Sequence, residues 1–250
     1  MSILVDNSGQ PAKSVLFIAP HPDDEAIFTG ATIHHLSSKG VTTTVLCCTD
    51  GLDPDSTDPS LASTRQRELK ESCRVIKATN LIYMGFPDSG LAGTVPESFA
   101  TRDQEKIAHS LIPVIKALGI DALVYDQDDG IYAHPDHAAA HQLGAQLAAI
   151  SQKASYLATV DAEHLAFFPP HLVHAAAQAA PSRPPIPQAH QTPRPGSVSA
   201  EISHVHIASP KDLAAKRAAF TAHASQISPD IVTSPSFKEI YGVEWFIRQT

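Results

Sequence analysis

The chain has 250 residues, enough for one sizeable α/β domain, and its 43% hydrophobic and 18% charged residues are typical of a soluble globular protein. A net charge of −8 and the lack of any dense Lys/Arg run argue against a nucleic-acid partner. The apolar runs are too short to span a membrane and the first residues do not resemble a signal peptide, so we expect a cytoplasmic protein.

The first 151 residues alternate between apolar, β-branched runs and segments with helical periodicity. Strands are expected at residues 15–19, 41–48, 81–84 and 121–125, and helices at 25–39, 64–78, 104–118 and 136–151. Cys47 and Cys48 lie inside the second strand and, with Cys73, favour buried thiols over disulfides. The alternation predicts an α/β, Rossmann-like three-layer fold, with a mostly parallel sheet and helices on both faces.

Beyond residue 153 the pattern is weaker. Further strands are expected at 155–160 and 204–208, and further helices at 210–223 and 237–248. Residues 169–196 contain eight prolines, a density that predicts an irregular segment, either a functional lid or a linker. We therefore expect one domain over residues 1–250, interrupted by this Pro-rich excursion at about 169–196.

The motif HPDDE follows the first strand, at residues 21–25. Its flanking prolines prevent both continued strand pairing and an immediate helix, so His21, Asp23 and Asp24 gather at the carboxyl end of a buried strand. Ligands bind at that edge of open α/β sheets. The two aspartates would also suit the first turn of a helix, where acids are favoured. The histidine beside them and a second cluster downstream favour a functional site.

That second cluster, YAHPDH at residues 132–137, repeats the arrangement after the fourth strand. His134 and His137 lie three residues apart at a helix N-terminus, so both can project toward the same sheet edge as the first motif. Imidazoles with carboxylates form the ligand set of a catalytic zinc ion with an open position, and ferrous iron (Fe2+) accepts the same set. Asp136 either orients one of these histidines or caps the helix.

Both motifs resemble those of the zinc-dependent de-N-acetylases of the PIG-L/LmbE type, in which HPDDE and HPDH are the signature. Further matches are Arg65 with Glu68, residues 85–90, and Lys216 with residues 223–226. The resemblance therefore covers nearly the whole chain outside the Pro-rich excursion.

The combination of residues 88–90 with residues 130–137 looks most similar to the actinobacterial mycothiol branch, which contains a biosynthetic deacetylase and a conjugate amidase. Two residues depart from the family pattern. Pro20 stands where Ala is usual before the first histidine, and Ala133 stands where Gly is usual before the second. Both flank the motifs, and neither departure removes a functional group.

The resemblance implies a zinc ion (Zn2+) held by His21, Asp24 and His137, with Asp23 as general base and then general acid. Amide hydrolysis needs a nucleophile, a charge sink and a proton for the leaving amine. Zinc lowers the pKa of bound water to about 7 and so supplies the nucleophile at neutral pH. Asp23, next to Asp24, is placed to take the proton of that water and pass it to the departing nitrogen.

The resemblance also implies that His134, as imidazolium, or the hydroxyl of Tyr132 stabilises the oxyanion of the tetrahedral intermediate. Arg65 and Asp88 are implied as contacts to the substrate. A surface ion pair with Glu68 is the alternative interpretation of Arg65.

The sequence therefore predicts a metal-dependent hydrolase that removes an N-acetyl group from an N-acetylglucosamine-type substrate. Its partner would be a small-molecule amino-sugar conjugate, and self-association is left open. The alternatives are an amidase that cleaves a larger conjugate amide and a non-catalytic metal- or nucleotide-binding α/β module. The first strand–helix turn argues against a nucleotide, because it carries acids and lacks a glycine-rich phosphate loop.

Overall fold

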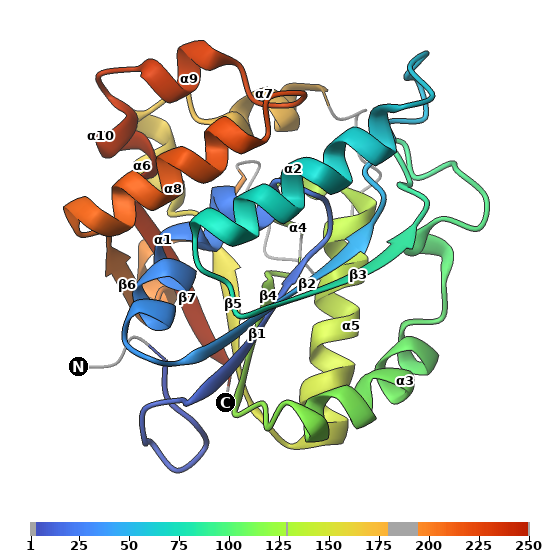
Figure 1. The fold of residues 1–250 in the computed structure, drawn as a ribbon, viewed down its shortest axis with the longest axis vertical. Coiled ribbons are helices and arrows are strands. Elements are labelled where there is room, and N and C mark those ends of the chain that lie inside the picture. The colour runs from blue at the N-terminus through green and yellow to red at the C-terminus, as the bar shows by residue number, and fades with distance from the viewer. Residues whose placement is uncertain (1–3, 129, 180–194, 250) are drawn as a thin grey trace.

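The computed structural model describes residues 4–128, 130–179 and 195–249. In this part of the chain one seven-stranded sheet has the order β3-β2-β1-β4-β5-β7-β6 (Figure 1). Its strands are β1 (Ser14–Ala19), β2 (Thr42–Thr49), β3 (Asn80–Phe86), β4 (Ala122–Asp126), β5 (Ala154–Thr159), β6 (His204–Ile207) and β7 (Val243–Gln249). Strands β1 to β5 pair in parallel, whereas β7 pairs antiparallel with β5 and β6. The predicted mostly parallel sheet is confirmed.

Helices cover both faces of this sheet (Figure 1). On one face lie α1 (Asp24–Ser38), α2 (Leu61–Val75) and α8 (Pro210–Ala222), and on the other α3 (Gln104–Ala117) and α5 (Pro135–Ser151). The shorter helices are α4 (Gly130–Ala133), α6 (Ala162–Phe167), α7 (Leu172–Ala179), α9 (Pro229–Thr233) and α10 (Phe237–Tyr241). No helix in the described ranges has the length and apolar character needed to cross a membrane.

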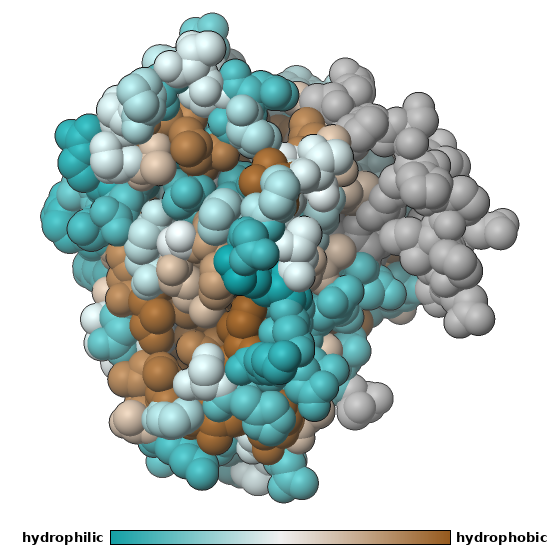
Figure 2. Space-filling model, turned by 90° about the vertical axis from the view of Figure 1, so that its right-hand side faces the viewer, coloured by the Kyte–Doolittle hydropathy of each residue, from teal (hydrophilic) through white to brown (hydrophobic). Residues whose placement is uncertain are grey.

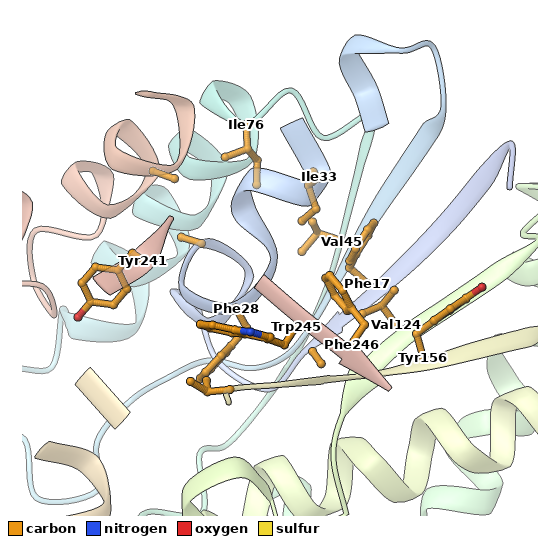
Figure 3. Packing of buried hydrophobic residues seen from close by; sticks show 14 of the residues in the cluster. Phe17, Phe28, Ile33, Val45, Ile76, Val124, Tyr156, Tyr241, Trp245 and Phe246 are labelled. Atoms are coloured by element: carbon orange, nitrogen blue, oxygen red, sulfur yellow. The ribbon is translucent and has the colours of Figure 1, made fainter. Parts of the chain in front are cut away.

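Strand β1 is buried on both faces because it lies in the middle of the sheet. Successive side chains of a strand point to opposite faces, so Phe17 enters the core beneath α1 and α8 while Ile18 enters the core beneath α3 and α5. Figure 3 shows Phe17 near Val45 and Val124, which come from the neighbouring strands β2 and β4. This packing on both sides fixes the position of the motif that follows β1.

A buried ion pair joins α8 and β7 to the middle of α1. Nζ of Lys216 lies 2.7 Å from Oε1 of Glu244, and both side chains are 1% exposed. The Glu244 carboxylate also accepts the backbone N–H groups of Ala31 and Thr32. Because its charge is matched and both of its oxygens accept hydrogen bonds, this carboxylate holds the three elements in one arrangement.

Most predicted elements are confirmed with small shifts at their ends. The largest shift is at α2, which begins at Leu61 and ends at Val75, ahead of the predicted helix at 64–78 on both sides. Before the helix, the carboxylate of Asp58 accepts the N–H and hydroxyl of Ser60 and forms the turn that precedes α2. After the helix, Lys77 has a φ of +60°, which ends the helical path.

The helix predicted at 237–248 is wrong over most of its length. Only Phe237–Tyr241 is helical, and the chain continues as the strand β7. Trp245 and Phe246 are buried there, and β7 forms hydrogen bonds with β5 on one side and β6 on the other. Aromatic and β-branched residues suit a strand, and the tertiary pairing decided between two local structures that the sequence allows.

The irregular segment predicted at 169–196 is wrong where α7 lies. The helix Leu172–Ala179 falls between Pro170 and Pro181, in a stretch without proline, so the proline density of the whole segment was a poor guide to this part. Residues 180–194 lie outside the described residues, and whether the segment is a lid or a linker stays a prediction.

Strand β3 forms one edge of the sheet and is half-buried along its whole length. Figure 2 shows the molecule from the side of β3 and α3, and hydrophobic residues gather in the lower part of this face. The sequence left self-association open, and this is a face on which hydrophobic side chains reach the surface.

Candidate active site

The three predicted metal ligands meet at the carboxyl ends of β1 and β4. Nδ1 of His21 lies 3.1 Å, and Nε2 of His137 lies 3.4 Å, from Oδ2 of Asp24. All three side chains are buried, and their potential ligand atoms lie within 4.8 Å of one another. The fold therefore brings together the residues that the family resemblance implies as zinc ligands.

The two motifs begin their helices differently. In the first, the Asp24 carboxylate accepts the backbone N–H of His21 at 2.8 Å and closes the turn that precedes α1. In the second, His134 is the N-cap of α5, where its Nδ1 accepts the N–H of Asp136 at 3.2 Å and Pro135 takes the first helical position. Both arrangements direct candidate ligand side chains from a helix N-terminus toward the same sheet edge.

Each candidate ligand histidine lies against a further carboxylate. Oδ2 of Asp126 lies 2.7 Å from Nδ1 of His137, and Oδ2 of Asp136 lies 3.2 Å from Nε2 of His21. Carboxylates in this position fix the tautomer and the ring direction of metal-binding histidines. The sequence alone leaves open whether Asp126 shapes the pocket or binds nothing. Its place as the last residue of β4, the strand that leads to the second motif, is the signal that would have found it.

The Asp136 carboxylate contacts the His21 ring, and the N-cap of α5 is His134. Besides its contact with His21, its two oxygens accept the backbone N–H groups of Ser89 at 2.8 Å and Ala100 at 3.0 Å. The hydrogen bonds of the His21 ring and the Ser89 N–H lower the pKa of Asp136 to about 2 despite its burial. Of the two interpretations that the sequence left open, the structure favours the orienting one.

A second group of potential ligands shares His21 with the first and consists of His21, Asp88, His134 and Asp136. The Asp136 carboxylate already accepts from one imidazole and two backbone N–H groups. Nδ1 of His134 likewise accepts a hydrogen bond from the backbone N–H of Asp136. These atoms are already paired within the protein, and the first group is the one that the family resemblance implies as the ligand set.

Asp23 has a strained backbone, with a φ of +128°. Its N–H donates to Oε2 of Glu25 at 3.0 Å, and its Oδ2 lies 3.1 Å from Nη2 of Arg65. Burial raises the pKa of Asp23 to about 6, although the Arg65 charge opposes this change. A carboxyl group that titrates near neutral pH suits a general base, and strained residues are common at functional sites.

The Arg65 side chain is buried and donates a hydrogen bond to the carbonyl of Gly51 at 2.6 Å, besides its contact with Asp23. The predicted alternative, an ion pair with Glu68, is wrong, because the Glu68 carboxylate instead accepts the N–H and hydroxyl of Ser225. Gly51 has a φ of +64°, and a Cβ there would lie 2.7 Å from Cζ of the arginine. Only glycine permits this approach, and the approach holds the guanidinium beside Asp23.

Glu25 and His223 form a buried pair behind Asp23. The family resemblance implies that His223 reaches the site, but the sequence does not indicate that it pairs with Glu25. Nε2 of His223 lies 2.7 Å from Oε1 of Glu25, and the hydroxyl of Ser72 donates to the same oxygen. Burial opposes a charge on His223, but the Glu25 carboxylate outweighs it and raises the pKa of the histidine. Two features of the sequence pointed to these residues. Glu25 is the last residue of the HPDDE motif, and His223 belongs to the family match at residues 223–226.

A cavity of about 560 Å³ opens above this cluster. Among the predicted site residues it is lined by His21, Asp23, Arg65, Asp88, Tyr132 and His134, and not by Asp24, His137 or Asp136. Asp53, Asp55 and Gln226 also line it, and sequence reasoning gave them no role. A cavity of this size holds a small organic molecule.

Tyr132 and His134 contribute two hydrogen-bond donors to the cavity wall. Burial and the neighbouring rings of His21 and His137 lower the pKa of His134 to about 2, so the predicted imidazolium is wrong and the ring is neutral. Because Nδ1 of His134 accepts a backbone N–H, the ring proton is on Nε2. The Tyr132 hydroxyl lies 2.9 Å from Nε2 of His137, and burial raises its pKa well above the usual value, so it stays protonated.

The two departures from the family pattern now have structural counterparts. Ala133 has a φ of +80°, a conformation that favours glycine, which explains why glycine is usual at this position. Pro20 sits where its carbonyl accepts both the N–H and the hydroxyl of Thr49 at 2.9 Å. Neither residue contributes a side chain to the cavity wall.

The charge balance of the cluster fits a divalent cation. Its carboxylates are those of Asp23, Asp24, Asp88, Asp126 and Asp136, against the single guanidinium of Arg65. Burial opposes charge on the imidazoles of His21 and His137, yet these carboxylates raise the pKa of both. The electrostatic field that favours a proton on these rings also favours a metal ion between them.

Comparison with known proteins agrees with this geometry. The family model described as GlcNAc-PI de-N-acetylase (PIG-L) matches residues 16–148, a range that contains both motifs. A 1D-myo-inositol 2-acetamido-2-deoxy-alpha-D-glucopyranoside deacetylase from Salinispora arenicola (strain CNS-205) is 29% identical, over 97% of this chain and 87% of the relative.

Solved structures resemble the fold over almost the whole chain. The N,N'-diacetylchitobiose deacetylase from Pyrococcus horikoshii has a TM-score of 0.59 at 22% identity, covering 95% of this chain and 84% of its own. The A40926 pseudoaglycone deacetylase has a TM-score of 0.63 at 15% identity, covering 94% and 95%. At these identities the likeness shows the shared fold.

Proposed function

The chain belongs to the GlcNAc-PI de-N-acetylase (PIG-L) family and is therefore a deacetylase, and we propose that its substrate is an N-acetylglucosamine unit joined to an inositol. The relative from Salinispora arenicola, which is similar over 97% of this chain, is named for such a substrate. One observation carries the proposal. The cluster of His21, Asp24 and His137 lies beneath a cavity large enough for an amino sugar, and His21 and Asp23 line the wall of that cavity.

His21, Asp24 and His137 would hold a zinc ion, with ferrous iron as the metal that accepts the same ligands. Zinc supplies a Lewis acid that polarises the amide carbonyl and makes water acidic enough to react at neutral pH. Asp126 and Asp136 hold the two imidazole rings in the direction that binding requires.

Asp23 takes a proton from the attacking water and later gives it to the amine nitrogen that leaves. Its pKa of about 6 leaves it mostly deprotonated at neutral pH and still able to carry a proton between the two steps. Arg65 and Glu25 hold its side chain and its backbone, respectively, so the carboxylate faces the cavity in one orientation. Arg65 thus acts first on Asp23, and only secondarily on the substrate.

The carbonyl oxygen gains negative charge as water attacks, and two donors stand near it. The neutral ring of His134 offers its Nε2–H, and the protonated hydroxyl of Tyr132 offers its hydrogen. Removal of one such donor typically costs about 10²–10³ in turnover.

Asp88 is the best candidate for binding the sugar. Its Oδ1 accepts the N–H of Gly90 at 2.8 Å, which fixes the carboxylate at the cavity wall. Asp53 and Asp55 line the cavity as well. Carboxylates accept hydrogen bonds from hydroxyl groups, so these residues suit the hydroxyl-rich sugar and inositol.

The test combines metal analysis with acetate release. Protein purified without chelator is expected to hold metal at the cluster, and to release acetate from the N-acetylglucosaminyl inositol faster than from free N-acetylglucosamine. Release should stop after chelation and return with zinc or iron. Metal without acetate release from any substrate would contradict the proposal and point to a larger amide. Equal rates on both substrates would remove the inositol from it.

A further inference from the structure

A second group of histidines lies around one aspartate, near the carboxyl end of α1. His34 and His35 come from α1, His206 from the edge strand β6, and Asp212 from the first turn of α8. Nδ1 of His34 lies 2.7 Å from Oδ1 of Asp212, and Nδ1 of His35 lies 3.2 Å from its Oδ2. Nε2 of His206 lies 3.9 Å from the same Oδ2.

Among the described residues, His206 is the member of this group with a buried ring nitrogen that lacks a hydrogen-bond partner. The residue is only 5% exposed, and its Nε2, which faces Asp212, has no hydrogen-bond partner among the described residues. A buried polar atom without a hydrogen-bond partner destabilises the folded state. The distance of 3.9 Å is too long for a hydrogen bond but leaves room for an ion between the two side chains.

We propose that His35, His206 and Asp212 bind a transition-metal cation such as zinc, at a site separate from the catalytic cluster. Their potential ligand atoms lie within 4.8 Å of one another. Two imidazole nitrogens and one carboxylate oxygen suit zinc, nickel or cobalt better than magnesium or calcium.

The surroundings of this site also suit a cation. The His35 side chain is 31% exposed, which gives a metal ion access from solvent. His34 holds the other oxygen of Asp212 and so fixes the direction of the carboxylate. The nearby positive charge of Lys216 is matched by Glu244 at 2.7 Å, so it opposes a bound cation little.

Asp212 also closes the N-terminus of α8. Its Oδ2 accepts the hydroxyl of Ser209 at 2.6 Å, and its backbone N–H donates to the same hydroxyl at 3.2 Å. Oδ2 also accepts the backbone N–H of Ser209 at 3.3 Å and lies 3.2 Å from Nδ1 of His35, so a metal ion would take the place of the direct contact with His35. A bound ion would therefore tie α1, α8 and β6 together while the helix cap stays in place.

We expect a metal ion at this site to stabilise the folded protein and to have no part in catalysis. Among the described strands β6 pairs only with β7, so a link from His206 to α1 and α8 adds a second attachment for the edge of the sheet. None of the residues of this site lines the cavity of the candidate active site. A metal ion that binds only the folded state raises the unfolding temperature with its concentration.

The experiment is a titration of metal-free protein with Zn²⁺ alone, followed by calorimetry and by thermal unfolding. Wild-type protein is expected to bind two equivalents. His206→Gln and His35→Gln should each lose one equivalent and the associated rise in unfolding temperature, and His137→Ala should lose the other. His204→Gln, two residues away on the same strand, is the matched control and should behave as wild type.

Unfolding of the metal-free variants checks that each is folded before the titration. Unchanged Zn²⁺ binding by His206→Gln, or an equal loss in His204→Gln, would overturn the proposal. His34→Phe should weaken the site about 10–100-fold, as loss of an orienting residue does. The measurement uses no substrate, so its outcome does not depend on the deacetylase proposal. One equivalent in wild type that is lost in His206→Gln would support this site and contradict the catalytic ligands.

Discussion

Helix α1 has a group of histidines and aspartates at each end, and the two groups differ in charge and surroundings. At the amino end, His21 and Asp24 lie among an excess of carboxylates, beside a cavity of about 560 Å³. At the carboxyl end, three imidazoles surround Asp212 alone, away from the lining of that cavity. The same residue types thus suit catalysis at one end and a structural link at the other. The two groups differ in the ratio of carboxylates to imidazoles, and only the group at the amino end lies beside the cavity.

The largest effect is expected from His137→Ala, which tests the amino end. The variant should lose the metal of the catalytic cluster and about 10⁴-fold or more in kcat/KM, since metal assistance supplies several kcal/mol. Metal analysis and acetate release measure both. His109→Ala, on an exposed part of α3, is the control. Full activity in His137→Ala would remove this residue from the ligand set.

Asp23→Asn separates chemistry from metal binding at the same end. Without a base, turnover should fall about 10²–10⁴-fold, while the metal content should stay at the wild-type level because Asp23 is not among the proposed ligands. Asp230→Asn, at the exposed start of α9, is a matched control for the loss of one carboxylate. A variant that lost metal and activity together would assign Asp23 to the ligands instead.

His223→Gln tests the buried pair behind Asp23. Turnover should fall about tenfold, as for loss of an orienting residue. The raised pKa of His223 means that its protonated form stabilises the fold. That contribution is complete below the unfolded value of 6.5 and is lost as pH rises through the higher folded value. Urea unfolding between pH 6 and 9 should therefore show a flatter pH dependence in the variant than in wild type. An unchanged slope would contradict the assignment.

The smallest effect is expected from Ala133→Gly, beside the second motif. Because Ala133 has a φ of +80°, glycine should relieve strain and raise the free energy of unfolding by about 1 kcal/mol. Ala145→Gly, inside α5, should lower it by about 1 kcal/mol. Thermal unfolding compares the two. A loss of stability in both variants would show that the turn at Ala133 carries no strain.

Patterns among neighbouring residues predicted correctly those features of the fold that depend on neighbouring residues. The parallel strands and their helices were predictable because apolar runs and helical periodicity are local properties. The nine residues placed at the site from sequence all lie at or beside the cavity, since both motifs follow strands of one parallel sheet. Family resemblance, not periodicity, distinguished the implied ligands from the implied base.

The predictions that were wrong concern features that depend on contacts between distant parts of the chain. The strand β7 was predicted as a helix because its residues allow both, and only pairing with β5 and β6 decided the outcome. Arg65 does not form the alternative ion pair with Glu68, and the close approach at Gly51 places it against Asp23, while its predicted contact with the substrate stays a prediction. The neutral state of His134 depends on burial among other imidazoles, which no local pattern reports.

The sequence by itself determined the fold class, the two motifs and the family, because strand and helix patterns and motif spacing are written in neighbouring residues. Only the tertiary structure decided which carboxylate orients which histidine, how Glu25 and His223 support Asp23, and that His206 joins two histidines of α1. These contacts link residues far apart in the chain. Their energies depend on burial and distance, and both are set when the sheet and its helices pack together.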